Sequence, residues 1–300
     1  MRAHRASFCV VAVVLVALAG CSGSEPSPAP AEDTVRFAAY DFSENQILVA
    51  VYAEAARRAG VPVSVESGVA TREVVEPALE QGVVDVVVDY LGTASRFVGL
   101  APSGPAQTPE QLRAGLADVL DDRGVTVLDA ASAEDQNGFA VATRFAAEHG
   151  VGKLSELAPL APDLVFGGPP ECADRPLCLP GLRSVYGMRF GEVRSMTSRA
   201  ATVEALAAGE IDVGLLETTD ARVGSAPVLL LIDDKSLQPH ENVVPLVRTD
   251  VLDREGDRLR AVLDDTSARL TTQALVSLNR AVEADGSTPE DAAARWWDAQ

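Results

Sequence analysis

From Val35 onwards the chain alternates short runs of β-branched residues with amphipathic stretches. Residues 83–88 are apolar at nearly every position, which is typical of a strand buried in a parallel sheet. Such alternation predicts an α/β fold in which helices cover parallel strands. The expected strands span 35–39, 61–65, 83–88, 125–128, 164–166, 211–216, 228–232 and 243–247, with another around Phe139, and the expected helices span 43–58, 71–81, 109–122, 143–149, 202–208, 254–268, 272–284 and 289–297.

The pattern divides into two similar halves, because a second series of strands and helices begins near Asp135. We therefore expect two lobes, each with a central β-sheet flanked by helices, hinged by crossing segments. Residues 34–133 together with 236–300 are expected to form the first lobe, and residues 134–235 the second. In the first helix Ser43 is the expected N-cap, with a glutamine three residues later as in a capping box.

The chain is strongly acidic, with 44 Asp and Glu against 25 Lys and Arg and a formal net charge of −19. This charge argues against nucleic acid as a partner, since affinity for phosphates comes from basic residues. Only three histidines occur, His4, His149 and His240. Their scarcity disfavours a His-rich zinc site and a Ser-His-Asp hydrolase, and we expect no metal, no cofactor and no enzymatic activity.

Residues 1–21 resemble a bacterial lipoprotein signal peptide. Two arginines precede an apolar stretch that is too short to span a membrane as a helix, and residues 18–21 read Leu-Ala-Gly-Cys, like the lipobox in which the cysteine is lipidated. Residues 22–33 are rich in Pro and Ser, which is typical of a flexible tether. We expect a lipid anchor on Cys21 that holds the protein on the outer face of the cell membrane. The alternative is a secreted protein in which Cys21 is incidental.

Two cysteines remain beyond this segment, Cys172 and Cys178. Outside the cytoplasm an isolated pair is typical of a disulfide, which here would close a tight loop around Arg175. Such a loop stabilises the fold by roughly 2 kcal/mol on the chain-entropy model. A metal site is the alternative, but two thiols without a nearby histidine are too few ligands.

Several strings resemble, in order, segments of the extracytoplasmic binding lipoproteins of osmoprotectant ABC importers. The resemblance covers the chain from about residue 34 to its end, and the chain looks like an actinobacterial member of this group. It implies a type II periplasmic-binding-protein-like fold, which closes two lobes over glycine betaine, choline, carnitine or a related quaternary amine. The similar strings are Asp-Phe-Ser-Glu-Asn-Gln at 41–46, Asp-Tyr-Leu-Gly-Thr at 89–93, Arg175 with Gly-Leu at 181–182 and Tyr-Gly at 186–187, Thr-Thr-Asp at 218–220, and Leu-Ile-Asp-Asp-Lys at 231–235 with Val-Pro-Leu-Val at 244–247.

The resemblance also implies which residues bind the ligand. Tyr90 follows a buried strand, at the sheet edge where α/β proteins form ligand sites, and a quaternary ammonium is bound by aromatic faces because it has no N–H. Thr93 would present a hydroxyl from the same loop, and Arg175 matches the arginine that binds the ligand's carboxylate. Without the resemblance these three residues read as a packing tyrosine, a helix N-cap and a surface charge. Asn137 and Thr218 belong to the same candidate set.

Four positions depart from the ligand cage that the family usually has. Phe139, Glu217 and Glu241 stand where tyrosines are expected, and Tyr40 stands where a lysine is expected. One interpretation is that the two glutamates supply carboxylates for a cationic ligand, with Tyr40 adding a ring. The other is that the pocket takes a different compound, such as a polyol or a larger aromatic, and that both glutamates face solvent.

These features predict a receptor that captures a small cation between its lobes and delivers it to the permease of an ABC transporter, and the family resemblance implies that the receptor is a monomer. Ligand binding would favour a closed arrangement of the lobes over an open one. One alternative is a surface lipoprotein that binds a different ligand for sensing or uptake. Another is an enzyme on the same scaffold, since a fold does not fix function.

Overall fold

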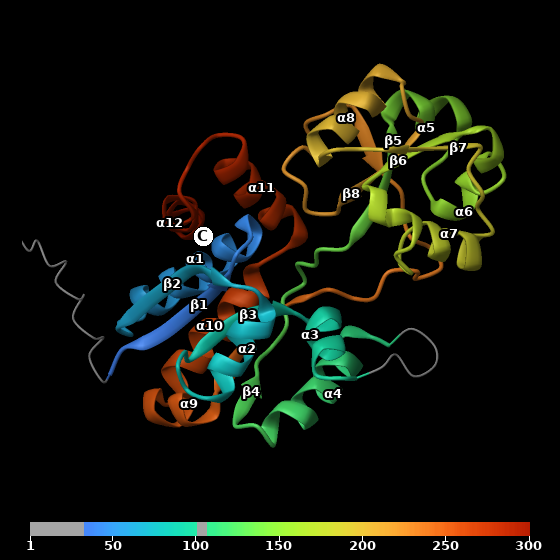
Figure 1. The fold of residues 1–300 in the computed structure, drawn as a ribbon. Coiled ribbons are helices and arrows are strands. Elements are labelled where there is room, and N and C mark those ends of the chain that lie inside the picture. The colour runs from blue at the N-terminus through green and yellow to red at the C-terminus, as the bar shows by residue number, and fades with distance from the viewer. Residues whose placement is uncertain (1–32, 101–106) are drawn as a thin grey trace, which may run out of the picture. The chain divides into compact units, whose positions relative to one another are not determined.

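The computed structural model describes residues 33–100 and 107–300, so the expected signal peptide, Cys21 and nearly all of the tether lie outside the described residues. The described chain forms two five-stranded sheets covered by helices, as the alternation of strands and helices predicts (Figure 1). The first sheet has the order β2-β1-β3-β10-β4 and consists of β1 (Val35–Tyr40), β2 (Val63–Ala70), β3 (Val86–Tyr90), β4 (Val125–Val127) and β10 (Val243–Arg248). The second has the order β7-β6-β8-β5-β9 and consists of β5 (Asn137–Ala142), β6 (Val165–Gly168), β7 (Glu192–Ser195), β8 (Val213–Glu217) and β9 (Val228–Leu230).

Both sheets are mixed rather than purely parallel. In the first sheet β1 is parallel to β2 and β3, whereas β10 is antiparallel to β3 and β4. In the second sheet β6 is parallel to β7 and β8, whereas β5 is antiparallel to β8 and β9. The expectation of parallel strands is therefore wrong for β10 and β5. The chain reaches β5 from the first sheet through residues 128–136, and it reaches β10 from the second sheet through residues 231–242. Neither of these two crossing segments contains the helical crossover that joins parallel neighbours.

Helices bury both faces of the first sheet. Neighbouring residues of β1, such as Phe37 and Ala38, belong to two different apolar clusters, because successive side chains of a strand point to opposite faces. One face is covered by α1 (Ser43–Arg58), α9 (Thr249–Glu255), α10 (Asp257–Arg269), α11 (Thr272–Glu283) and α12 (Pro289–Asp298). The other is covered by α2 (Arg72–Glu80), α3 (Leu91–Phe97) and α4 (Pro109–Asp121).

The second sheet is buried in the same way on a smaller scale. In β5, Phe139 and Val141 belong to one apolar cluster and Ala140 to another. The first cluster includes α5 (Thr143–His149), α6 (Leu154–Leu157) and α7 (Leu179–Tyr186) with the short 3-10 helices η1 (Ala161–Asp163) and η2 (Pro170–Ala173), and the second includes α8 (Arg199–Ala208).

Among the helix boundaries that differ from the sequence prediction, two concern how a helix begins or where it is interrupted. The N-cap of α1 is Phe42, which makes no side-chain cap, so the predicted cap at Ser43 is wrong. The start of α1 is instead fixed by Asn45, whose Oδ1 accepts the N–H of Tyr40 at 2.7 Å and whose Nδ2 donates to the carbonyl of Val88 at 2.7 Å. The helix predicted over 254–268 is broken into α9 and α10 at Gly256, which has a left-handed φ of +64°.

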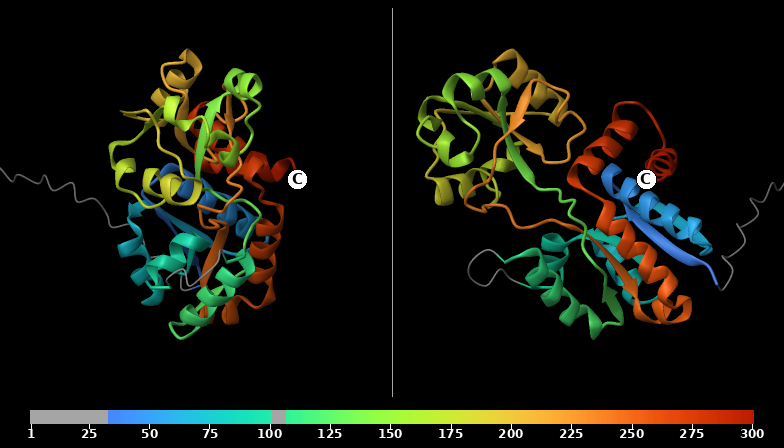
Figure 2. Two further views of the ribbon diagram at one scale, coloured as in Figure 1. Left: turned by 90° about the vertical axis from the view of Figure 1, so that its right-hand side faces the viewer. Right: turned by 180° about the vertical axis from the view of Figure 1, so that it is seen from behind.

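The chain passes from the first sheet to the second after β4 and returns before β10, and Figure 2 shows both crossing segments from two further sides. After β10 the four C-terminal helices stay with the first sheet. In α12 the indole N–H of Trp297 donates to the carbonyl of Val51 in α1 at 3.0 Å, and Trp296 packs against the same cluster. The two tryptophans thus anchor the C-terminal helix to α1.

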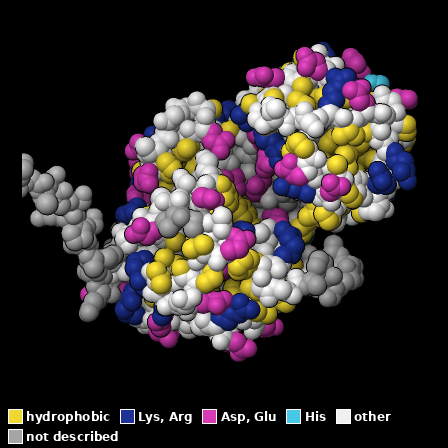
Figure 3. All heavy atoms as spheres, viewed as in Figure 1, with side chains coloured by type: hydrophobic (Ala, Val, Ile, Leu, Met, Phe, Trp, Pro, Cys, Tyr) yellow, Lys and Arg dark blue, Asp and Glu magenta, His cyan; other side chains and the backbone are white. Residues whose placement is uncertain are grey.

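The described part of the chain contains no helix with the length and apolar composition that a membrane span needs. On the face shown in Figure 3, acidic and basic side chains are interspersed. The sulfurs of Cys172 and Cys178 are adjacent, and their Cα atoms lie 5.3 Å apart, a separation that suits a disulfide.

Candidate functional site

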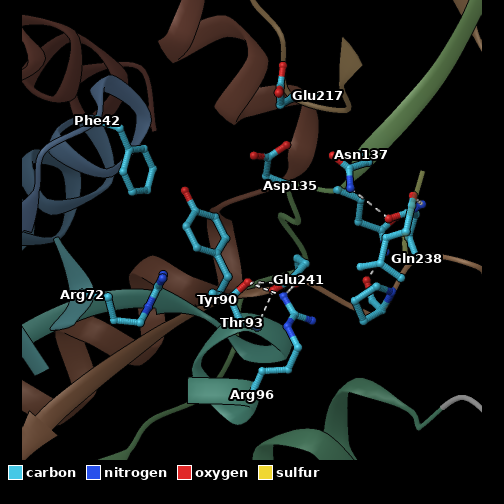
Figure 4. A pocket seen from close by; sticks show the side chains of 13 residues that line it. Phe42, Arg72, Tyr90, Thr93, Arg96, Asp135, Asn137, Glu217, Gln238 and Glu241 are labelled. Carbon is cyan, nitrogen blue, oxygen red and sulfur yellow. Dashed lines mark hydrogen bonds and ion pairs between the residues drawn. The ribbon is translucent and has the colours of Figure 1, made fainter. Parts of the chain in front are cut away.

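A pocket of about 320 Å³ lies where the crossing segments meet elements of both sheets (Figure 4). The part of the chain around the first sheet contributes the end of β3, residues of α3, the residue before α1 and the first residue of α2. The crossing segments, β5, β8 and the loop before α7 contribute the rest. The lining residues are Phe42, Arg72, Tyr90, Thr93, Arg96, Asp135, Gln136, Asn137, Leu177, Glu217, Gln238, Pro239 and Glu241.

Two aromatic rings form part of the wall. Tyr90 is the last residue of β3, and its hydroxyl donates to Oε1 of Glu44 at 2.6 Å. Phe42 precedes α1, is 42% exposed, and its ring centre lies 6.4 Å from that of Tyr90 at an interplanar angle of 24°. Aromatic faces attract cations within about 6 Å of the ring centre, at roughly 0.5–2 kcal/mol each. The rings therefore give the pocket a surface suited to an ammonium group.

Glu241 anchors the start of α3 from the returning crossing segment. Its carboxylate accepts the Thr93 N–H at 2.8 Å and the Thr93 hydroxyl at 2.9 Å, and it pairs with Nη2 of Arg96 at 2.8 Å. Tyr90, the N-cap of α3, offers no side-chain acceptor, so Glu241 satisfies an N–H that the helix itself leaves unpaired. Burial raises the pKa of Glu241, and the charge of Arg96 opposes that rise.

Gly92 makes the close approach of Glu241 possible. A Cβ on Gly92 would lie 2.8 Å from the carbonyl oxygen of His240 and 2.9 Å from Oε1 of Glu241. Both separations are too short for a side chain, so a glycine is needed here for contact between α3 and the crossing segment.

Glu217 ends β8, and its carboxylate is held by Arg199, the first residue of α8. Nε of Arg199 donates to Oε1 of Glu217 at 2.7 Å and to Oε2 at 2.6 Å, and Nη2 makes a further contact with Oε1. The pair is part-buried, with the Glu217 side chain 34% exposed. Glu217 thus reaches the pocket wall with its charge already balanced.

The outgoing crossing segment is held on both sides. The Thr218 hydroxyl accepts the N–H of Gln136 at 2.9 Å, and Nε2 of Gln136 donates to the carbonyl of Pro239 at 2.7 Å. Nδ2 of Asn137 donates to Oε1 of Gln238 at 3.2 Å. These bonds join the two crossing segments to each other and to the end of β8, which fixes the floor of the pocket.

Asp135 and Glu44 bring two more carboxyl groups to this region. Burial raises the pKa of Asp135 well above its ordinary value, and the nearby charge of Glu44 raises it further. Burial also raises the pKa of Glu44, against the effect of hydrogen bonds from Thr219, Tyr90 and Asn279. The Tyr90 hydroxyl donates to Oε1 of Glu44 at 2.6 Å, and Nδ2 of Asn279 donates to Oε2 of Glu44 at 2.7 Å. Hydrogen bonds from the side chain and the backbone of Thr219 oppose the rise in the pKa of Asp135, whose Oδ1 is buried and has no hydrogen-bond partner among the described residues.

A buried network supports the pocket from behind. Asp89 is fully buried in β3 and accepts from Nη2 of Arg72 at 2.5 Å, from Nε of Arg72 at 2.8 Å and from the Tyr90 N–H at 2.8 Å. The Tyr40 hydroxyl lies 2.8 Å from both Asp89 Oδ2 and Glu76 Oε1. Because a hydroxyl has one hydrogen, both contacts are satisfied when Glu76 is protonated and donates to Tyr40. Burial, together with the charge of Asp89, raises the pKa of Glu76 to about 8, in agreement with that arrangement.

This raised pKa predicts a pH dependence of stability. A carboxyl whose pKa is higher in the folded state stabilises fully below its unfolded pKa of 4.5, and the contribution is lost as the pH rises to about 8. We expect the Glu76→Gln variant to lose less stability than the wild type between pH 5 and pH 8, because the variant lacks the titrating carboxyl group. The difference is at most about 1.4 kcal/mol per pH unit, the contribution of a single proton. Urea denaturation across this range measures the difference. The control is Glu80→Gln on the exposed end of the same helix, and equal slopes for wild type and Glu76→Gln would contradict the expectation.

Five of the nine sequence-predicted ligand-binding residues line the pocket, namely Tyr90, Thr93, Asn137, Glu217 and Glu241. Glu217 and Glu241 lie in the pocket wall rather than on an open surface, and each carboxylate is paired with an arginine.

Tyr40 and Thr218 lie outside the wall. Tyr40 is 1% exposed, and the guanidinium carbon of Arg72 lies 4.7 Å from the centre of its ring. That face of the ring is therefore occupied by a cation of the protein itself. Thr218 uses its hydroxyl on the backbone of Gln136 and supports the crossing segment instead of facing the pocket.

Phe139 and Arg175 also lie outside the wall. Phe139 is two residues further along β5 than Asn137, is 1% exposed, and packs against Phe166 with ring centres 6.4 Å apart. The side chain of Arg175 is 60% exposed and pairs with Glu171 at 3.2 Å. Phe139 is therefore part of the core of the second sheet, and Arg175 is a surface charge in this structure.

Eight lining residues were not predicted from the sequence: Phe42, Arg72, Arg96, Asp135, Gln136, Leu177, Gln238 and Pro239. Phe42 lies inside a string that carries the family resemblance, so its aromatic ring was a usable signal. Asp135 and Gln136 precede a predicted strand, at the boundary between the predicted lobes. The others have no local signal, because the fold brings them to the pocket from α2, α3, the loop before α7 and the segment before β10.

Comparison with known proteins gives one family. Residues 33–299 match the family model for the substrate-binding domain of ABC-type glycine betaine transport systems. The chain is 25% identical over 285 residues to the glycine-betaine-binding protein of Pseudomonas aeruginosa, covering 91% of this chain and 90% of that protein. It is also 25% identical over 282 residues to the glycine betaine-binding protein YehZ of Escherichia coli K12, covering 89% of this chain and 90% of that protein.

Solved structures share the fold. A crystal structure described as a glycine betaine/carnitine/choline ABC transporter superposes with a TM-score of 0.79 at 21% identity, covering 88% of this chain and 98% of that chain. The apo structure of YehZ from Escherichia coli gives a TM-score of 0.78 at 22% identity, covering 89% and 98%. These neighbours have the two-lobed architecture of periplasmic binding proteins, which agrees with the fold class predicted from the sequence.

Proposed function

The chain belongs to the family of substrate-binding domains of ABC-type glycine betaine transport systems, and from this premise we propose that its pocket captures a quaternary ammonium solute and delivers it to the permease of an ABC importer. The observation that carries the proposal is the pocket itself, whose lining combines two aromatic rings with the carboxyl groups of Asp135, Glu217 and Glu241. Aromatic faces bind methylated ammonium groups that offer no N–H, and carboxylates add long-range attraction. The relatives described as glycine-betaine-binding proteins support the same ligand class.

We propose that Tyr90 and Phe42 bind the methyl groups and that Thr93, Asn137, Glu217 and Glu241 complete the wall. The first lobe comprises residues 34–133 and 236–300, and the second comprises residues 134–235. Each lobe holds one of the two sheets, and the crossing segments act as the hinge. Ligand that binds the closed arrangement better than the open one shifts the equilibrium toward closure, and the closed form is the one that the permease engages.

The extracytoplasmic setting follows from the family, because the substrate-binding proteins of ABC importers work outside the cytoplasm. We further propose that residues 1–21 are a signal peptide, that Cys21 carries a lipid anchor, and that residues 22–33 tether a monomeric receptor to the membrane. In this setting Cys172 and Cys178 form a disulfide, which their adjacent sulfurs support.

Thermal unfolding of the purified full chain tests the ligand class. We expect choline, glycine betaine or carnitine to raise the melting temperature, because ligand at one hundred times its Kd stabilises the folded state by about 2.7 kcal/mol, which is roughly 5–10 °C for a domain of this size. Spermidine and glycerol serve as a polyamine and a polyol for comparison. Stabilisation by glycerol alone would favour the alternative ligand class, and no shift with any quaternary amine would remove the main support for the proposal.

A further inference from the structure

The charges that line the pocket are balanced in pairs, with one exception. The two lining arginines each bind a carboxylate, and Glu217 is bound by an arginine. Asp135 is the one charged lining residue that forms no ion pair with a described residue. The pairs are Arg72 with Asp89, Arg96 with Glu241, and Arg199 with Glu217.

Asp135 is held in a position that directs its carboxyl group into the pocket. Its N–H donates to the carbonyl of Glu241 at 3.2 Å, which fixes the backbone of one crossing segment against the other. Its side chain extends toward the space between the Tyr90 hydroxyl and Glu217 (Figure 4). Oδ1 is buried and has no hydrogen-bond partner among the described residues. A buried carboxylate oxygen without a hydrogen-bond partner is unfavourable, and a cation bound in the pocket would relieve part of that cost.

The neighbouring donors are engaged elsewhere. The hydroxyl of Tyr90 donates to Glu44, and Nδ2 of Asn137 donates to Gln238. The hydroxyl of Thr93 donates to Glu241. Asp135 therefore lies near the ring of Tyr90, and a cation bound in the pocket can compensate its charge.

We propose that Asp135 is a specificity-determining residue, and that it makes this pocket select a quaternary ammonium without a carboxylate, the choline class, over a zwitterionic betaine. The inference rests on the proposed function and narrows its substrate class. A monocation gains the attraction of Asp135 while Phe42 and Tyr90 contact its methyl groups. The negative charge of Asp135 would repel the carboxylate of a betaine, and both lining arginines are already paired with carboxylates of the protein.

The surroundings of Asp135 give the inference a second signature. The titratable groups that face it are Glu44 from α1, Tyr90 from β3 and Glu217 from β8, the last of which is paired with Arg199. Burial and the charge of Glu44 raise the pKa of Asp135 above its ordinary value. A bound cation favours the carboxylate. Choline binding should therefore release a proton, and its affinity should rise as the pH increases through the titration of Asp135.

Isothermal titration of choline chloride and glycine betaine into the purified full chain tests the inference. We compare wild type, Asp135→Asn, Asp135→Glu and the control Asp41→Asn, which removes the same charge from an exposed position next to Phe42. Wild type is expected to bind choline at least tenfold more tightly than glycine betaine. Asp135→Asn should reduce this ratio at least tenfold, whereas Asp135→Glu and Asp41→Asn should preserve the preference for choline. Circular dichroism and thermal unfolding establish that each variant is folded.

Repeating the titrations in phosphate and in Tris, which differ in their heat of protonation, measures proton release. Wild type should release protons on binding choline, and Asp135→Asn should release fewer. An unchanged ligand ratio in folded Asp135→Asn, or a wild type that prefers glycine betaine, overturns the role of Asp135 and leaves the proposed function standing. A wild type that binds neither ligand overturns the proposed function and this inference with it.

Discussion

Replacement of Asp89 by Ala is expected to lower the free energy of unfolding by about 3–5 kcal/mol, because removal of one partner from a buried ion pair leaves the other charge uncompensated. Asp89 is fully buried, and Arg72 is only 18% exposed, so water cannot readily replace the lost carboxylate. The substitution also removes the acceptor for the Tyr90 N–H and for the Tyr40 hydroxyl. A loss of this size is a large fraction of the 5–15 kcal/mol that typically stabilises a folded domain.

Urea denaturation followed by circular dichroism measures this loss. The matched control is Asp250→Ala, which breaks an arginine–carboxylate pair of similar geometry with Arg248. The Asp250 side chain is 65% exposed, and an exposed pair contributes at most about 1 kcal/mol. If the Asp89 variant loses no more stability than the Asp250 variant, the network behind the pocket does not support the fold as we describe it.

The Glu241→Gln variant is expected to bind choline roughly tenfold more weakly and to bind glycine betaine relatively better. The amide keeps an oxygen that accepts the Thr93 N–H, but it no longer neutralises Arg96. The pocket wall then gains one positive charge. At an effective dielectric constant of about 20–40, a charge about 8 Å from the ligand changes the binding free energy by about 1–2 kcal/mol, and 1.4 kcal/mol corresponds to tenfold.

Titration of both ligands at low and moderate salt measures this effect, which should shrink as salt screens the new charge. Asp265→Asn removes a carboxylate that pairs with Arg269 on the exposed side of α10, and it should leave both affinities unchanged. A Glu241→Gln protein with wild-type affinity for both ligands would mean that the Arg96 charge does not reach the ligand.

Most of the fold could be predicted from the sequence because its long elements carry local signals. The predicted helix over 43–58 matches α1, and that over 143–149 matches α5, since amphipathic periodicity and terminating glycines mark both. α3 was missed because neither of its ends carries a local signal: Tyr90 provides no side-chain cap, and the C-cap is Val98 rather than a glycine. Its cap comes from Glu241, 148 residues away from Thr93, and no local pattern reveals such a partner. The directions of β5 and β10 were missed for a related reason, since pairing direction depends on the path of the crossing segments.

The site was harder to predict because side-chain type does not reveal side-chain partners. Glu217 and Glu241 were placed at the pocket by resemblance, but the sequence did not show that arginines 199 and 96 pair with them. Tyr40 carries the right ring for a cation, and Arg72 already covers it. Asp135 was seen only as the start of a second series of strands and helices, and its lack of a partner emerges only from the three-dimensional arrangement.

The two stretches of backbone that join the sheets also contribute pocket residues, among them Asp135 and Gln136 on one and Gln238 and Glu241 on the other. A ligand bound there contacts the crossing segments themselves rather than a surface remote from them. Any change in the torsion angles of these stretches moves the groups that contact the ligand. Release of the ligand and reorientation of the sheets are therefore expected to share one energy barrier, and a substitution in either stretch should alter the dissociation rate and the rate of opening together.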